Sequence, residues 1–142
     1  MEGLMMANEQ SVFWDDLARD LEDPAFLREY IVESMRIATI DDLVNSLDEA
    51  REAAGMTKAD LARAISAEPA VVRRLFSGGH MNPTLGTVAE VAAALGMRVT
   101  VERLPAAERK VVTDPLVKGR STDTGRLAEH LTAMRTRSKT AA

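Results

Sequence analysis

The sequence contains no cysteine, and this absence excludes several classes of site at once. Disulfides, thiol nucleophiles and thiolate metal ligands all require cysteine, and a chain without it fits a reducing compartment. Aromatic residues are scarce, at 4% of 142 residues, whereas hydrophobic residues make up 46%. A composition rich in alanine and leucine, with few β-branched runs, predicts a globular and mainly α-helical chain.

Other signals are missing too. No stretch approaches membrane-spanning length, and residues 1–10 lack the basic and apolar regions of an export signal, so we expect a cytoplasmic protein without membrane contact. His80 and His130 have no companion ligands at metal-site spacing. There is no phosphate-binding glycine loop and no nucleophile motif. We therefore expect no enzyme activity, no cofactor and no metal.

Acidic residues are concentrated at the start of the chain. Residues 1–56 hold 14 Asp/Glu against 4 Lys/Arg, whereas residues 57–104 hold 4 against 6 and residues 105–142 hold 4 against 8. This asymmetry is consistent with one cationic and one anionic partner, although solvated helix faces alone produce the same split.

Residues 1–38 have the pattern of an acidic, helical N-terminal extension. Ser11 is placed to cap a first helix, and Asp23-Pro24 to start a second that ends near Arg36. Large apolar side chains recur in both at helical spacing: Phe13, Trp14, Leu17, Leu21, Phe26 and Tyr30. Such stripes are more often core than partner-binding surface.

Start and stop signals divide residues 39–96 into further helices. The starts are two capping boxes and two helix-opening prolines: Thr39 with Asp42, Thr57 with Asp60, Pro69, and Asn82-Pro83-Thr84. The stops are glycines: Gly55, Gly78-Gly79 and Gly96.

Residues 97–104 alternate apolar and polar side chains, which predicts a β-strand with Val99 and Val101 on one face. A strand needs a partner for its backbone hydrogen bonds. The partner is either residues 110–113 or the same strand of a second subunit.

Residues 105–142 are basic, rich in Ser and Thr, and interrupted by Pro115 and two glycines. We expect a largely flexible tail. Within it, Leu127, Leu131 and Met134 have the spacing of a short amphipathic helix that forms on binding. Either the basic charge of the tail contacts DNA, or this apolar stripe docks on a protein partner.

Two short helices joined by a tight turn, the second opening with proline, are the arrangement that presents one helix to the DNA major groove. Residues 43–97 resemble the Xre/Cro-type helix-turn-helix family at characteristic positions: Thr57, Leu61-Ala62, Ile65, Ala67, Val72, Leu75, Gly78, Asn82-Pro83 and Leu95-Gly96. The resemblance implies a mainly α fold. It consists of a five-helix helix-turn-helix domain over residues 39–96, with extra N-terminal helices, one C-terminal strand and the tail.

Several positions depart from the family pattern. Lys58 replaces the usual glutamine after the cap, Ser66 replaces the usual turn glycine, and Phe76 replaces a common glutamate. Lys58 favours a phosphate contact over a bidentate base contact. Phe76 is expected to pack rather than to bridge helices.

The positions that usually offer polar side chains to base edges in the family are here Glu68, Pro69, Ala70 and Val71, so Arg74 becomes the best candidate for base reading. Val72 and Leu75 point inward, so the neighbouring arginines project outward, and we expect base contacts from Arg74, Ala70, Pro69 and Glu68. We expect phosphate contacts from Lys58, Arg73, Ser77 and Asn82. The alternative is that the arginines only solvate an exposed helix.

Residues 20–62 are similar to the front half of antitoxins in HigA-type and RelE-partnered toxin–antitoxin modules. The resemblance implies a small repressor that neutralises a small, basic, RelE/HigB-like ribonuclease toxin and autoregulates their operon. Because one subunit offers few cations to DNA, we also expect a homodimer that binds a palindromic operator. The candidate toxin contacts are Phe13, Trp14, Leu17, Phe26 and Tyr30. The alternative is a free-standing Xre-family transcriptional regulator with no toxin partner.

Overall fold

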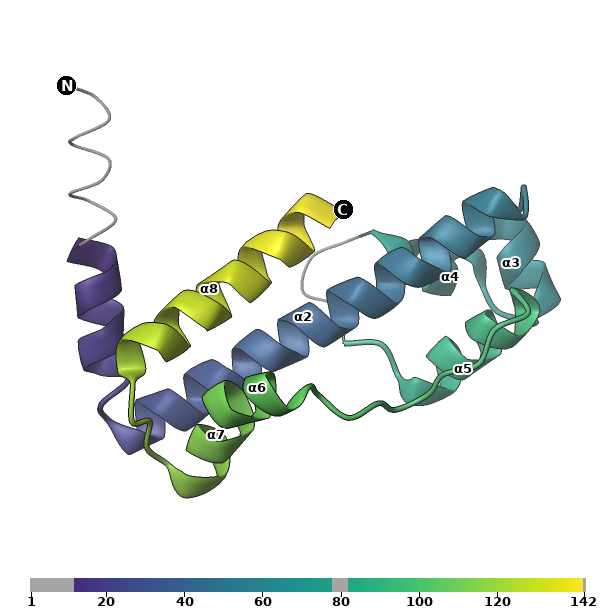
Figure 1. Ribbon diagram of the computed structural model, residues 1–142. Coiled ribbons are helices and arrows are strands. Elements are labelled where there is room, and N and C mark those ends of the chain that lie inside the picture. The colour runs from purple at the N-terminus through teal and green to yellow at the C-terminus, as the bar shows by residue number, and fades with distance from the viewer. Residues whose placement is uncertain (1–11, 78–81, 142) are drawn as a thin grey trace. The chain divides into compact units, whose positions relative to one another are not determined.

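The computed structural model describes residues 12–77 and 82–141, and the chain divides into two compact units (Figure 1). Unit 1 contains residues 12–38 and 103–140, and unit 2 contains residues 39–102. The predicted cap at Ser11 and the predicted stop at Gly78-Gly79 lie outside the described residues.

One long helix, α2 (Pro24–Ala53), supplies residues to both units. The prediction of one helix ending near Arg36 and another capped by Thr39 is wrong, because α2 continues through both positions (Figure 1). Its apolar positions change phase along the helix. Leu27, Ile31 and Ala38 follow one helical stripe, and Leu47 falls outside that stripe. This change of phase resembles a helix boundary when only the sequence is read.

Unit 1 is built from the two ends of the chain. Residues 12–20 are helical and precede α2, and four C-terminal elements complete the unit: α6 (Ala106–Glu108), η1 (Arg109–Thr113), α7 (Asp114–Lys118) and α8 (Thr124–Ala141). Its core combines apolar side chains from all of these parts of the chain except α6 and α7: Leu17, Leu21, Leu27, Ile31, Ala38, Val112, Leu127, Ala128, Leu131 and Met134.

The prediction that residues 105–142 form a flexible tail is wrong. Leu127 and Leu131 of α8 are 0% exposed and belong to the same core as Leu27 and Ile31 of α2. Burying one such side chain contributes roughly 1.5–3 kcal/mol. The helical stripe of α8 is therefore satisfied inside unit 1, without an external partner.

Polar contacts reinforce this packing. Arg135 of α8 donates from Nε to Ser34 Oγ at 2.9 Å, and its guanidinium lies 4.6 Å from the centre of the Tyr30 ring. Arg28 of α2 donates to the backbone oxygens of Leu116 and Val117, each at 3.2 Å. Buried Ser34 and the last carbonyls of α7 thereby obtain hydrogen-bond partners.

Residues 110–113 are not a strand partner, because they lie in the π-helical segment η1. The backbone N–H of Asp114 donates to the oxygen of Arg109, five residues earlier. Pro115 follows and cannot donate to Val111, so the ordinary α-helical ladder is interrupted here in any case.

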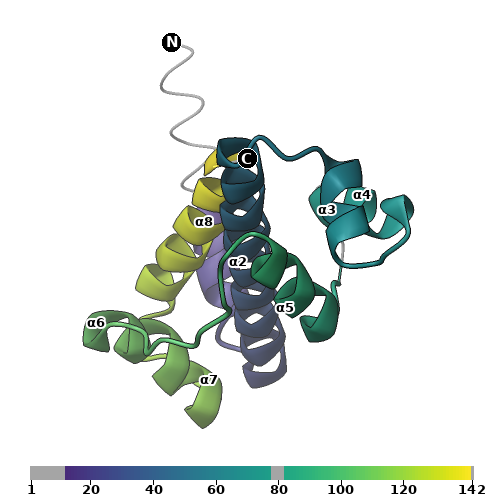
Figure 2. The same cartoon turned by 90° about the vertical axis from the view of Figure 1, so that its right-hand side faces the viewer.

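Unit 2 contains α3 (Lys58–Ala64), α4 (Pro69–Phe76) and α5 (Leu85–Ala94), together with the second half of α2. Contacts of α3 with both α4 and α5 hold the three short helices together (Figure 2). The core is formed by their inward apolar side chains and one from α2: Leu47, Leu61, Ala62, Val72, Leu75, Val88, Val91 and Ala92.

The prediction of a β-strand over residues 97–104 is wrong within a single chain. No strand occurs in residues 12–77 or 82–141, and residues 97–105 have neither helix nor strand. Met97 N–H donates to Ala92 O, but the backbone of residues 98–104 makes no hydrogen bond to any other described residue. A strand requires a paired neighbour, and the described chain supplies none.

Candidate nucleic-acid interface

The first helix of the interface, α3, begins with the predicted capping box. Thr57 Oγ1 accepts from the Asp60 backbone N–H at 3.0 Å, and Asp60 Oδ2 accepts from the Thr57 backbone N–H at 2.9 Å. This reciprocal pair satisfies two of the N–H groups that a helix start leaves free. The prediction at these residues is confirmed, and the start of α3 is well defined.

The same contacts lower the pKa of the Asp60 carboxyl below its usual value. The Thr57 backbone hydrogen bond is the largest cause, followed by the Thr57 hydroxyl and the nearby charge of Arg63. Since the folded-state pKa is the lower one, the cap contributes stability at neutral pH and loses it as the pH falls through that value.

The turn between α3 and α4 contains a strained residue. Ser66 has φ of +53°, in the left-handed region, and no other non-glycine residue of the described chain has a positive φ. This is the position at which the resemblance implies glycine. A side chain in this conformation costs about 1–2 kcal/mol, because its Cβ crowds the following carbonyl oxygen.

We expect Ser66→Gly to stabilise unit 2 by roughly 0.5–1 kcal/mol, since the relief of strain exceeds the extra entropy of glycine in the unfolded chain. Hydrogen exchange at the buried amides of Leu61 and Ala62 measures this change. Ser66→Ala is the control, because it removes the hydroxyl and keeps the strain. Equal protection from hydrogen exchange in the two variants would show that the backbone conformation of Ser66 does not limit the stability of unit 2.

The second helix, α4, has one buried apolar side and one exposed basic side. Pro69 occupies its first turn, where a missing N–H costs nothing, and Val72 and Leu75 are buried in the core of unit 2. Arg73 and Arg74 are exposed on the other side. Two cations on neighbouring exposed positions of one short helix form a surface suited to an anionic partner.

The two arginines differ in their surroundings. Arg74 donates from Nε to Ala70 O at 3.3 Å, so its side chain lies back along its own helix. Arg73 makes no hydrogen bond or ion pair with another described residue. Arg73 is thus available for contact, whereas Arg74 must exchange one solvent-exposed hydrogen bond to reach a ligand.

The other predicted base contacts surround the start of α4. Glu68 is the N-cap residue, makes no side-chain cap hydrogen bond, and is exposed, as is Pro69. Ala70 is half-buried. Glu68 can accept a hydrogen bond from a cytosine amino group, and the other two side chains can only make apolar contact.

Apart from Arg73, which lies within α4, the predicted phosphate contacts lie at or near the ends of the three short helices. Lys58 opens α3 and is half-buried, whereas Asn82 is exposed shortly before Thr84, the N-cap residue of α5. Ser77 is the C-cap residue of α4, and its hydroxyl donates to Arg74 O at 2.9 Å.

Phe76 packs as expected. It lies against the core of unit 2, and the Arg51 guanidinium is 5.8 Å from the centre of its ring. Arg51 also donates to Met56 O at 2.8 Å and to Asp48 Oδ1 at 2.9 Å. Sequence reasoning did not single out Arg51. Its only local signal is the spacing of three residues from Asp48, which is common on any helix.

The predicted toxin contacts are mostly part of the core of unit 1. Leu17 is buried, and Trp14, Phe26 and Tyr30 pack against the same core. Phe13 is 51% exposed, with its ring edge-on to Trp14 at a centroid distance of 5.8 Å. These placements favour the intramolecular interpretation for four of the five residues.

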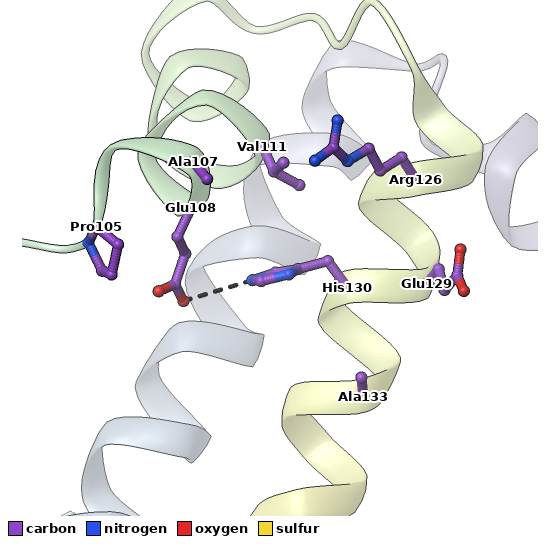
Figure 3. Close-up of a pocket in the computed structure, with 8 residues that line it drawn as sticks. All are labelled: Pro105, Ala107, Glu108, Val111, Arg126, Glu129, His130 and Ala133. Atoms are coloured by element: carbon purple, nitrogen blue, oxygen red, sulfur yellow. Dashed lines mark hydrogen bonds and ion pairs between the residues drawn. The ribbon is translucent and has the colours of Figure 1, made fainter.

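A shallow pocket lies in unit 1, between α8 and the segment of α6 and η1 (Figure 3). His130 and Glu108 line it, with His130 Nε2 3.4 Å from Glu108 Oε1, and Arg126 and Glu129 line it too. In the part of the chain that the structure describes, no group of three or more His, Asp or Glu residues could hold a metal ion. The pocket holds no nucleophile beside this pair, and we assign it no chemistry.

Comparison with known proteins bears on unit 2. A search of curated proteins and a search of solved structures each found no match. No helix in residues 12–77 or 82–141 is long and apolar enough to cross a membrane. Residues 47–101 match the helix-turn-helix family. This segment of the chain is therefore a helix-turn-helix domain, and DNA binding in transcription regulation is the function that it indicates.

Proposed function

We propose that the chain is a homodimeric transcriptional repressor whose helix α4 reads a palindromic operator. The observation that carries the proposal is the exposed pair Arg73 and Arg74, opposite the buried Val72 and Leu75. Each subunit offers few cations to DNA, so a single unit 2 binds weakly. Two subunits that read half-sites about 34 Å apart supply the missing affinity.

Within this proposal the residues have different tasks. Arg74 donates two parallel hydrogen bonds to O6 and N7 of guanine, and Arg73 and Lys58 hold phosphates and set the register. Glu68 accepts from a cytosine amino group, and Ala70 contacts a thymine methyl group. The bidentate guanine contact is worth roughly 1–3 kcal/mol of discrimination, more than the about 0.5–1.5 kcal/mol of the Arg74 hydrogen bond that it replaces.

Selection from a random duplex library with the full chain tests DNA binding. We expect the enriched sequences to contain two inverted half-sites, with centres about one helical turn apart, and their affinity to fall steeply with salt. An unenriched library, together with flat titrations in dilute buffer, would reject the proposal.

We further propose that the chain is the antitoxin of a toxin–antitoxin module and that unit 1 binds the toxin. The support is charge, because unit 1 exposes seven carboxylates in the first part of the chain: Asp15, Asp16, Asp20, Glu22, Asp23, Glu29 and Glu33. A ribonuclease that approaches RNA needs a cationic surface, which these carboxylates complement. Phe13 is the predicted contact that is exposed enough to add an apolar anchor.

The free-standing regulator remains a second candidate, and one observation favours it. The core of unit 1 is completed without a partner by side chains of the N-terminal extension: Trp14, Leu17, Phe26 and Tyr30. The extension therefore has a structural role within the chain that requires no toxin.

Co-purification with the product of the neighbouring reading frame separates the two candidates. We expect a small basic protein whose toxicity is relieved by the full chain. A variant with Asp15, Asp16 and Asp20 changed to Lys should lose that complex and retain DNA binding. The control changes Asp42 and Glu49 to Lys, at exposed positions of unit 2. A neighbour that is neither toxic nor retained leaves the free-standing regulator as the function.

A further inference from the structure

The segment that connects α5 to unit 1 has the composition of a strand rather than of a linker. Flexible linkers are rich in Gly, Ser or Pro, whereas residues 97–102 read Met-Arg-Val-Thr-Val-Glu, with β-branched residues at three successive positions. Val99 is 39% exposed and Val101 is 98% exposed. A strand-forming segment with exposed valines and no backbone partner among the described residues is an open edge for pairing.

We infer that two copies of the chain pair antiparallel along residues 98–102, centred on Thr100, which specifies how the homodimer proposed above is held together. In a twofold-symmetric antiparallel pair, the symmetry axis passes through one central residue of each strand. A residue that lies before this centre faces the residue of the partner strand that lies the same number of positions after it. Thr100 then faces Thr100 of the partner subunit. Val99 faces Val101 of the partner subunit, and Arg98 faces Glu102 of the partner subunit.

This register gives favourable side-chain pairs on both faces of the two-stranded ladder. The two valine pairs bury the apolar side chains that a single chain leaves exposed. On the other face, the symmetry produces two opposite-charge pairs between Arg98 and Glu102, which form no ion pair with any described residue of their own chain. Apolar and opposite-charge cross-strand pairs each contribute roughly 0.2–1 kcal/mol.

The neighbouring registers lack this combination. A centre at Val99 sets Arg98 opposite Thr100, and a centre at Val101 sets Val99 opposite Arg103. If the twofold axis passes between two residues, apolar side chains of one strand lie opposite polar side chains of the other, so neither face of the ladder is purely apolar. Only the centre at Thr100 pairs valine with valine and arginine with glutamate together.

Cross-linking tests the register directly, because the chain has no cysteine of its own. The Cα atoms of directly opposed residues lie about 4.5–5.5 Å apart, within disulfide range. Thr100→Cys should therefore give a covalent dimer on mild oxidation. Arg103→Cys is the control, since its two copies would be six residues, or about 20 Å, out of register. Equal cross-linking of both variants, or none at position 100, would overturn the register.

Charge exchange tests the same pairing without covalent chemistry. Arg98→Glu and Glu102→Arg should each raise the dimer dissociation constant roughly tenfold in sedimentation equilibrium, because two attractive pairs become repulsive. The double variant should restore the wild-type value. Arg103→Glu, opposite Met97 of the partner subunit, is the control and should change the constant by less than about threefold. Single variants that dimerise like the wild type, or a double variant that is not rescued, would reject the pairing.

Both experiments are done without DNA, so their outcome is independent of operator binding. A cross-linked dimer that binds no duplex would reject the repressor proposal and keep the register. A repressor that binds its palindrome but fails to cross-link at position 100 would reject the register alone. A wild-type chain that stays monomeric at all concentrations would reject the ladder and the homodimer together.

Discussion

Leu131→Ala is expected to destabilise unit 1 by about 2–5 kcal/mol, the largest loss of stability from any single change considered for this chain. Leu131 is 0% exposed, and its removal leaves a cavity among side chains from both ends of the sequence. If residues 105–142 were a flexible tail, the same substitution would have almost no effect. The experiment therefore separates the observed fold from the fold predicted by composition.

The chain supplies its own reporter for this measurement. Trp14 is the one tryptophan in the sequence, and it packs against the core of unit 1. Urea unfolding followed by its fluorescence reports unit 1, while unit 2 is silent. Val32→Ala, at a position of α2 that is 51% exposed, is the matched control and should cost less than about 0.5 kcal/mol. Overlapping unfolding curves for both variants and the wild type would show that α8 does not stabilise unit 1.

Arg74→Ala and Arg73→Ala are expected to weaken DNA binding in different ways. Loss of Arg74 should cost roughly 1–3 kcal/mol on operators with guanine at the contacted position and far less on operators without it. Loss of Arg73 should weaken binding to all sequences alike and reduce the slope of log affinity against log salt by about one. Titrations of both variants on a matched set of operator substitutions measure the two effects.

Arg74→Lys is the control that keeps the charge. Lysine attracts phosphate as a point charge but cannot reproduce the planar pair of donors that guanine requires. This variant should therefore lose base preference while the salt slope stays unchanged. Identical losses for Arg73→Ala and Arg74→Ala on every operator would mean that both arginines only contact the backbone.

Local chemistry determined much of unit 2. The capping box of Thr57 and Asp60, the opening proline of α4 and the inward positions of Val72 and Leu75 are all correctly predicted from neighbours in the sequence. Each depends on interactions within one or two helical turns, which is the range over which a sequence pattern is informative. Phe76 could also be predicted to pack, although its contact with Arg51 could not.

Non-local packing decided unit 1 and the middle of α2. Composition made residues 105–142 look flexible, because Ser, Thr, Lys and Arg there are not offset by any apolar stripe longer than three residues at helical spacing. That short stripe is enough when it meets the opposite end of the chain, as Leu127 and Leu131 do with Leu27 and Ile31. Similarly, the change of apolar phase within α2 looked like a break between helices, whereas the helix has different neighbours in its two halves.

The sequence by itself determined the helix-turn-helix and the exposed arginines of α4, because caps, turns and periodicity are local. Only the tertiary structure decided which core Trp14, Phe26 and Tyr30 pack against, that the C-terminal segment folds, and that residues 97–104 have no strand partner within the described chain. These outcomes depend on which distant segments meet, and the free energy of burying apolar surface is gained only when they do.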